Sequence, residues 1–229
     1  MNHVDMIAVV ARALGPDLLA KVAFVGGCTT GLLLTDAFSK QQVRHTDDVD
    51  LIVHVVGHVG LASLQAQLVG CGFSHSMEDD APICAMRLGQ LRVDFMPDDV
   101  AVLGFTNRWY AQALHSALPF ALPDGQVIRL LTPAFFVATK LEAYLGRGNN
   151  DPLGSRDIED ILTLVDGRAE LVQDLQTASL ELRSFVATEL RRLMPLVPFS
   201  YAVTSAAGND AGRERLIFER LETLVGMAA

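Results

Sequence analysis

The sequence predicts an α+β protein, with a mixed β-sheet and flanking helices in residues 1–131 and a mainly helical part in residues 132–229. Short apolar runs bounded by turn residues, the pattern of strands, are confined to the first part. In the second part, apolar residues recur at helical spacing in one segment after another. We place a domain boundary between Leu131 and Thr132, because Thr132-Pro133 provides a helix N-cap followed by proline at the first helical position.

Residues 4–131 carry alternating signals for helices and strands. Apolar residues at helical spacing predict an opening helix over residues 4–19, broken at Gly15-Pro16. Two further helices are predicted, over residues 28–35 and 59–69. The predicted strands are 22–25, 48–55, 83–88, 91–96, 119–122 and 127–131. The last four form two predicted hairpins, separated by Gly-Gln and Pro-Asp-Gly-Gln turns, and Pro119 confines its strand to a sheet edge.

The second part is predicted to be a series of helices. Their ranges are 134–147, 155–165, 171–175, 180–194 and 213–225. Pro195 and Pro198 interrupt the helical pattern, and residues 205–212 are expected to form a flexible loop.

The composition is that of a soluble globular protein. The chain has 229 residues, of which 50% are hydrophobic and 20% charged, and its formal net charge is −9. That charge excludes general nucleic-acid binding through the whole surface, although a local basic patch can still bind nucleic acid. No apolar run reaches the roughly 18 residues needed to cross a bilayer. Three cysteines without zinc spacing suit a reducing compartment, so we expect a cytoplasmic protein without membrane partners.

Three aspartates in predicted strands are the candidate metal ligands. Asp48 and Asp50 are two positions apart, so both side chains point to one face of the strand, roughly 7 Å apart. Asp94 lies mid-strand between apolar residues, where a charge is costly unless a partner or metal compensates it. Carboxylates hold hard cations such as Mg²⁺ or Mn²⁺, and paired ions of this kind support nucleotidyl transfer. The alternative is a solvated strand end at which Asp48 and Asp50 face water.

The glycine pair Gly26-Gly27 ends the first predicted strand. Glycine lets backbone amides approach a phosphate closely, and the N-terminus of the predicted helix behind the pair favours an anion. Most glycine pairs only form turns, and the chain contains neither a P-loop motif nor a dinucleotide-binding motif. Gly26 and Gly27 are therefore candidate phosphate contacts only in combination with the acids.

Basic residues follow on the first helix of the second part. Lys140, Tyr144 and Arg147 share one side of the helix predicted over residues 134–147. A lysine and an arginine facing a metal site would contact a triphosphate and neutralise charge on the leaving pyrophosphate. A solvated basic edge is an equally good explanation of Arg147, whereas the apolar neighbours of Lys140 favour a functional role.

Two acids on the next predicted helix have both a structural and a functional explanation. Asp157 and Asp160 lie in its first turns after the cap Ser155, where the helix dipole favours negative charge. They could also orient Lys140. His54 and His58 flank a predicted strand end, which disfavours a zinc site.

Together these residues resemble the nucleotidyltransferase superfamily, whose fold is shared with DNA polymerase β. The longer pattern resembles the AbiEii/MenT-type nucleotidyltransferase toxins and spans roughly residues 23–165. Its parts are the glycine pair, Arg44-x-Thr46-x-Asp48-x-Asp50, Lys140-Leu141-x-Ala143 and Arg156-Asp157-x-x-Asp160-Ile161.

The resemblance implies that a nucleoside monophosphate is transferred from an NTP, such as ATP, to a hydroxyl acceptor with the help of Mg²⁺ or Mn²⁺. It implies Asp48 and Asp50 as metal ligands, Asp94 as a third acid and base, and Lys140 as a triphosphate ligand. The implied nucleotide contacts are Gly26, Gly27, Thr29, Thr30, Arg44, Thr46, Lys140 and Arg147, with Asp157 and Asp160 in support. Some members of the family are toxins that add nucleotides to the tRNA acceptor end and are restrained by a partner antitoxin.

Cys28 departs from the family pattern, because these enzymes commonly have serine or threonine after the glycines. Thr29 or Thr30 is the candidate for the missing hydroxyl. Two alternative functions stay open: transfer to a small hydroxylated molecule such as an antibiotic, and a non-catalytic nucleotide-binding or regulatory protein with the same fold.

Overall fold

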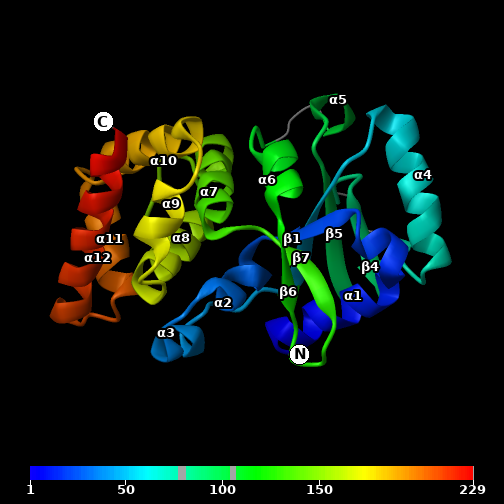
Figure 1. The fold of residues 1–229 in the computed structure, drawn as a ribbon, viewed down its shortest axis with the longest axis horizontal. Coiled ribbons are helices and arrows are strands. Elements are labelled where there is room, and N and C mark those ends of the chain that lie inside the picture. The colour runs from blue at the N-terminus through cyan, green and yellow to red at the C-terminus, as the bar shows by residue number, and fades with distance from the viewer. Residues whose placement is uncertain (77–80, 104–106, 229) are drawn as a thin grey trace. The chain divides into compact units, whose positions relative to one another are not determined.

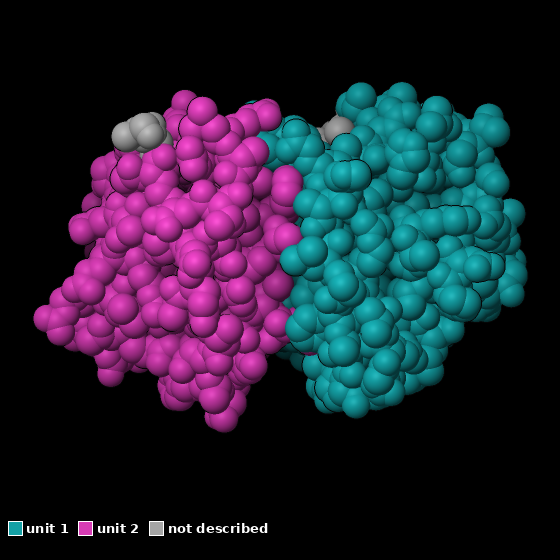
Figure 2. All heavy atoms as spheres, in the orientation of Figure 1, with its two compact units in different colours: residues 1–29, 45–131 teal, residues 30–44, 132–229 magenta. Residues whose placement is uncertain are grey.

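A computed structural model describes residues 1–76, 81–103 and 107–228 (Figure 1). The chain forms two compact units, coloured separately in Figure 2. Residues 1–29 and 45–131 form the sheet unit, and residues 30–44 and 132–229 form the helical unit. The chain passes from the sheet unit to the helical unit after Leu131, and residues 30–44 also belong to the helical unit.

The sheet unit contains a seven-stranded mixed sheet. Its strands are β1 (Val22–Val25), β2 (Asp48–Val53), β3 (Ser74–His75), β4 (Ala85–Leu88), β5 (Leu91–Pro97), β6 (Leu118–Ala121) and β7 (Val127–Leu130), in the spatial order β3-β4-β5-β2-β1-β7-β6. β2 pairs in parallel with β5, and β1 with β7, while the other neighbours are antiparallel. The predicted mixed sheet and both hairpins are confirmed, and Pro119 lies on the edge strand β6.

The centre of this sheet is apolar. Every residue of β1 is buried, which explains why this short run contains no polar side chain. The helices of the unit are α1 (His3–Leu19), α4 (Gly57–Gly70), α5 (Val100–Leu103) and α6 (Tyr110–Ser116). α1 is kinked at Gly15, whose φ of 67° is not helical, as the Gly-Pro pair predicted. α4 lies beside the strands in Figure 1, at the cyan part of the chain.

The expected helix over residues 28–35 is wrong as a single element. The chain instead forms a 3₁₀ turn, η1 (Gly27–Thr29), and then the short helix α2 (Thr30–Leu33). The division between the two units falls between Thr29 and Thr30.

The helical unit is arranged around α8 (Arg156–Gly167), whose apolar stripe is fully buried. The other elements are α2, α3 (Ala37–Gln41), α7 (Pro133–Arg147), α9 (Leu171–Gln176), α10 (Leu180–Leu193), α11 (Val197–Ala206), α12 (Ala211–Val225) and η2 (Gly226–Ala228). Thr132 and Ser155 cap α7 and α8 through their hydroxyl groups, as predicted. None of the helices described is both long enough and apolar enough to span a membrane.

Helix α11 corrects an expectation. Pro198 was expected to interrupt helical structure, but it lies in the first turn of α11, where its missing N–H has no helical partner to lose. The expected flexible loop over residues 205–212 is also shorter than predicted, because α12 already begins at Ala211.

Residues 30–44 join the helical unit through polar contacts at the end of α8. The backbone N–H groups of Thr35 and Asp36 donate to the Gly167 carbonyl, at 3.0 and 2.9 Å. Arg168 donates to the carbonyl of Leu33 at 2.9 Å. Arg213 of α12 donates to Ser39 at 2.8 Å. These contacts satisfy backbone groups at the C-terminus of α8 and of the segment itself.

Candidate active site

Three carboxylates of the sheet unit converge. Asp48 and Asp50 lie on β2, and Asp94 lies on β5 directly beside Asp50 in the parallel register. One oxygen atom from each of the three side chains lies within 4.8 Å of the other two. Asp94 is buried, whereas Asp48 and Asp50 are half-buried. Strand alternation and parallel pairing therefore bring together three hard oxygen ligands, which suit a divalent cation.

Gly26 makes room for this cluster. Its φ is +79°, and a Cβ atom at this position would lie 1.9 Å from Oδ2 of Asp50. Any side chain here would therefore be strained in its backbone and would collide with a carboxylate of the cluster. The sequence suggests glycine at this position for phosphate approach, and the structure adds the close packing of Asp50 as a second reason.

Thr46 holds Asp48. The Thr46 hydroxyl donates a hydrogen bond to Oδ1 of Asp48, and Thr46 itself is buried. Thr46 was expected to contact the nucleotide, and the structure shows it in contact with a candidate metal ligand. A hydroxyl donor in this position fixes the orientation of the carboxylate, which is how groups around metal ligands commonly act.

Arg92 is a member of the cluster that sequence reasoning missed. Its Nε donates to Oδ1 of Asp94 at 3.0 Å and its Nη2 to Oδ2 at 2.8 Å. The bidentate ion pair offsets one of the three negative charges and holds both oxygens of Asp94 in place. The available signal was strand alternation, because Arg92 and Asp94 are two residues apart on β5 and so share a face.

The nearby thiol Cys84 has a different role from a metal-binding thiolate. Burial raises the pKa of Cys84 to about 12, and the negative charge of Asp94 adds to the effect. Thiolate is the form that binds metals, so Cys84 stays a neutral packing residue at physiological pH.

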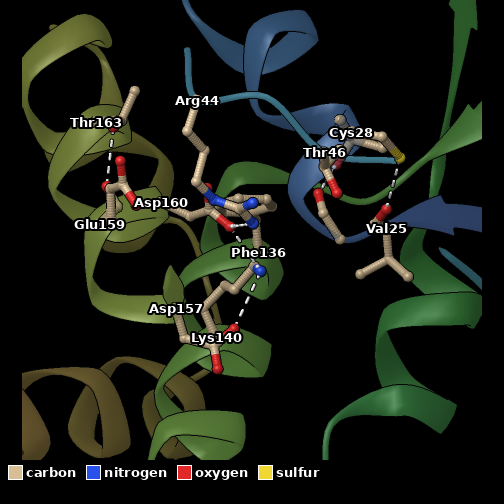
Figure 3. Close-up of polar contacts among 12 residues, drawn as sticks. Val25, Cys28, Arg44, Thr46, Phe136, Lys140, Asp157, Glu159, Asp160 and Thr163 are labelled. Carbon is tan, nitrogen blue, oxygen red and sulfur yellow. Dashed lines mark hydrogen bonds and ion pairs between the residues drawn. The ribbon is translucent and has the colours of Figure 1, made fainter. Parts of the chain in front are cut away.

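The turn after β1 is closed by its own side chains. The Thr29 hydroxyl donates to the Gly26 carbonyl at 2.8 Å. The Cys28 thiol contacts the Val25 carbonyl at 3.4 Å (Figure 3). Cys28 is fully buried, so its thiol has a packing role. Thr30 is also fully buried, but its hydroxyl forms no hydrogen bond within the described part of the chain.

A second charged cluster lies in the helical unit (Figure 3). The ammonium group of Lys140 on α7 pairs with Asp157 at 3.1 Å and with Asp160 at 2.7 Å, both on α8. All three side chains are buried. The structure thus places the two acids in contact with Lys140, the arrangement considered from their positions in the sequence.

Two arginines complete this cluster. Arg44 donates through Nε and Nη2 to the two oxygens of Asp160, both at 2.9 Å. Arg147 donates to both oxygens of Asp157, also at 2.9 Å. Burial alone would raise the pKa of Asp157, but the hydrogen bonds from Arg147 and the charge of Lys140 lower it below the usual value for aspartate. Three basic side chains therefore surround the two carboxylates.

The candidate residues are thus divided between the two units. The sheet unit holds the three acids with Gly26, Gly27, Thr29 and Thr46, and the helical unit holds Thr30, Arg44, Lys140, Arg147, Asp157 and Asp160. His54 pairs with Asp98 at 2.9 Å, and the three aspartates are the single group in residues 1–76, 81–103 and 107–228 with three clustered metal-ligating side chains. No protein-family model and no curated protein matches this chain.

We expect Gly26→Ala to weaken Mn²⁺ binding at least about tenfold, because the new methyl group displaces the Asp50 carboxylate. Gly125→Ala is the matched control: its φ is +87°, but a Cβ atom there meets nothing within 4 Å. Both variants carry similar backbone strain, of about 1 kcal/mol. Titration of each purified variant with Mn²⁺ measures the difference, and equal affinities in the two variants would contradict the role assigned to Gly26.

Proposed function

We propose that the protein is a metal-dependent nucleotidyltransferase that transfers a nucleoside monophosphate from an NTP to a hydroxyl acceptor. The observation that carries this proposal is the convergence of Asp48, Asp50 and Asp94 on one face of the sheet, with oxygen atoms within 4.8 Å of one another. Carboxylate ligands without histidine or thiolate favour Mg²⁺ or Mn²⁺ over zinc. The nucleotidyltransferase fold, which the sequence resembles, is part of the same proposal.

The cluster fits such an ion chemically. Asp48 and Asp50 would hold it, with Asp94 contributing a lone pair that Arg92 does not use, since an ionised carboxylate has about four acceptor positions. A bound divalent cation would withdraw charge from the reacting phosphoryl oxygens and from the leaving pyrophosphate.

The protein groups then have defined tasks in the transfer. The acceptor oxygen forms a bond to the α-phosphorus, the bond between that phosphorus and the oxygen bridging to the β-phosphate breaks, and pyrophosphate leaves. Asp94 takes the proton of the acceptor hydroxyl, and Arg92 keeps both Asp94 oxygens oriented for it. Lys140 would contact the triphosphate through its ammonium group, the role that the sequence suggests for this residue.

Two acceptor classes are compatible with this chemistry. The family resemblance favours the acceptor end of tRNA, in a toxin restrained by an antitoxin. The net charge of −9 favours a small hydroxylated molecule, because it opposes binding of a polyanion over a broad surface.

Incubation with Mg²⁺ and each labelled NTP, with total tRNA or with hydroxylated small molecules as acceptors, tests the proposal. We expect transfer to one acceptor class, with release of pyrophosphate, and a loss of at least about 100-fold in Asp50→Asn. Asp17→Asn is the control, because it makes the same charge change at an exposed residue of α1. No transfer from any NTP to either class, or full activity in Asp50→Asn, would contradict the proposal.

Thr30 generates a second prediction. The buried Thr30 hydroxyl has no hydrogen-bond partner within the described residues, which lowers stability, and the family resemblance makes Thr30 a candidate contact of the nucleotide. We expect Thr30→Val to increase the free energy of unfolding by about 1 kcal/mol and to raise the KM for NTP roughly 3- to 10-fold. Thr29→Val is the control, because its hydroxyl already donates to Gly26, and this change should lower stability instead. An unchanged KM in Thr30→Val would exclude Thr30 as the hydroxyl that replaces the missing one at Cys28.

A further inference from the structure

His3 contacts the segment that leads into β2. The backbone N–H of Thr46 donates to Nε2 of His3 at 3.2 Å. The rings of His3 and His45 also lie close together, with centroids 6.0 Å apart and planes tilted by 48°. His3 is the first residue of α1, so a helix and the start of a strand meet at this contact.

The position of His3 is set by α1 itself. The Asn2 side chain caps the helix by accepting from the N–H of Asp5 at 2.8 Å. The first turns of α1 bury Met6 and Ile7, so the helix cannot shift without exposing core residues. His3 is therefore a fixed acceptor rather than a mobile surface side chain.

The start of β2, by contrast, pairs with a neighbouring strand on one side only. Asp48 pairs with Arg92 of β5, whereas the register with β1 runs from Val53 only as far as Asp50. Thr46 precedes the strand and lies outside any helix or strand. Its N–H has no part in the sheet ladder, and a buried N–H requires an acceptor. His3 supplies that acceptor.

Thr46 connects His3 to the acid cluster, because it contacts both His3 and Asp48. Its N–H is held by His3 while its hydroxyl donates to Oδ1 of Asp48, so one residue links the helix to a candidate metal ligand. Because Nε2 of His3 accepts, the contact uses the neutral ring with its proton on Nδ1. The chain of contacts runs from α1, through the backbone and side chain of Thr46, to the carboxylate.

We propose that His3 is a positioning residue for the metal site, which holds Asp48 in its ligating orientation through Thr46. The proposal rests on the metal-dependent function proposed above. His3 acts through Thr46, so its effect appears in the affinity of the site for the ion.

The test measures Mn²⁺ affinity in four variants: His3→Phe, His3→Gln, Thr46→Val and the double variant His3→Phe/Thr46→Val. Phenylalanine fills the space without an acceptor, and the glutamine amide oxygen can still accept from the Thr46 N–H. We expect His3→Phe to lose about tenfold in affinity and His3→Gln to stay within about twofold of the original protein. Because His3 acts through Thr46, the double variant should lose little more than Thr46→Val alone, a coupling that general destabilisation would not produce.

The outcomes separate this inference from the proposed function. Asp48→Asn, measured alongside, should abolish Mn²⁺ binding at the cluster; if it does not, the metal site itself is wrong. If Asp48→Asn abolishes binding, three results would overturn the role of His3. His3→Phe could leave Mn²⁺ affinity unchanged, or His3→Gln could bind as weakly as His3→Phe. The third result is a double variant whose loss of affinity equals the sum of the losses in His3→Phe and Thr46→Val. Circular dichroism and thermal unfolding of each variant confirm that affinity is compared between folded proteins.

Discussion

Mutual repulsion between three carboxylates is the constraint on which the organisation of the sheet unit depends. Two unit charges about 4 Å apart repel by roughly 4 kcal/mol in a partly buried site, so three acids at such separations require compensation. The described residues provide some of it: Arg92 binds Asp94 through two hydrogen bonds, and the Thr46 hydroxyl binds Asp48. The remaining negative charge is what a divalent cation would neutralise. Metal binding, as proposed above, would explain why the sheet maintains this costly arrangement.

The helical unit also contains buried charges that require compensation, in this case two carboxylates paired with basic side chains. Asp157 and Asp160 are almost fully buried, which would be prohibitive for unpaired carboxylates. Lys140, Arg44 and Arg147 share these two acids and compensate their buried charge. A buried pair that loses one partner typically destabilises a protein by about 3–5 kcal/mol. The ion pairs of these acids with Lys140 therefore join α8 to α7.

Local patterns predicted the parts of the structure that depend on near neighbours. Alternation along β2 placed Asp48 and Asp50 on one face, turn residues marked both hairpins, and the caps Thr132 and Ser155 marked the starts of α7 and α8. Residues 30–44 could not be assigned to the helical unit in this way, because their contacts run to Gly167 and Arg213, more than a hundred residues away. Local sequence patterns could not predict the contact of His3 with the Thr46 N–H either, because it joins a side chain to a backbone group 43 residues away. Side-chain alternation along β5 could have identified Arg92 as a neighbour of Asp94, because residues two positions apart on a strand share a face. Arg92 was missed because Asp94 was considered without its neighbours.

We propose that Asp48, Asp50 and Asp94 hold a metal ion that serves nucleotidyl transfer. A crystal structure of the protein with Mn²⁺ and a non-hydrolysable NTP analogue, measured at a wavelength at which Mn²⁺ scatters anomalously, tests it most directly. We expect an anomalous peak about 2.1 Å from oxygen atoms of Asp48 and Asp50, with phosphate oxygens of the analogue completing the coordination. A structure in which Mn²⁺ and the analogue bind away from these carboxylates, with the Asp94–Arg92 pair and the Asp48–Thr46 contact undisturbed, would contradict it.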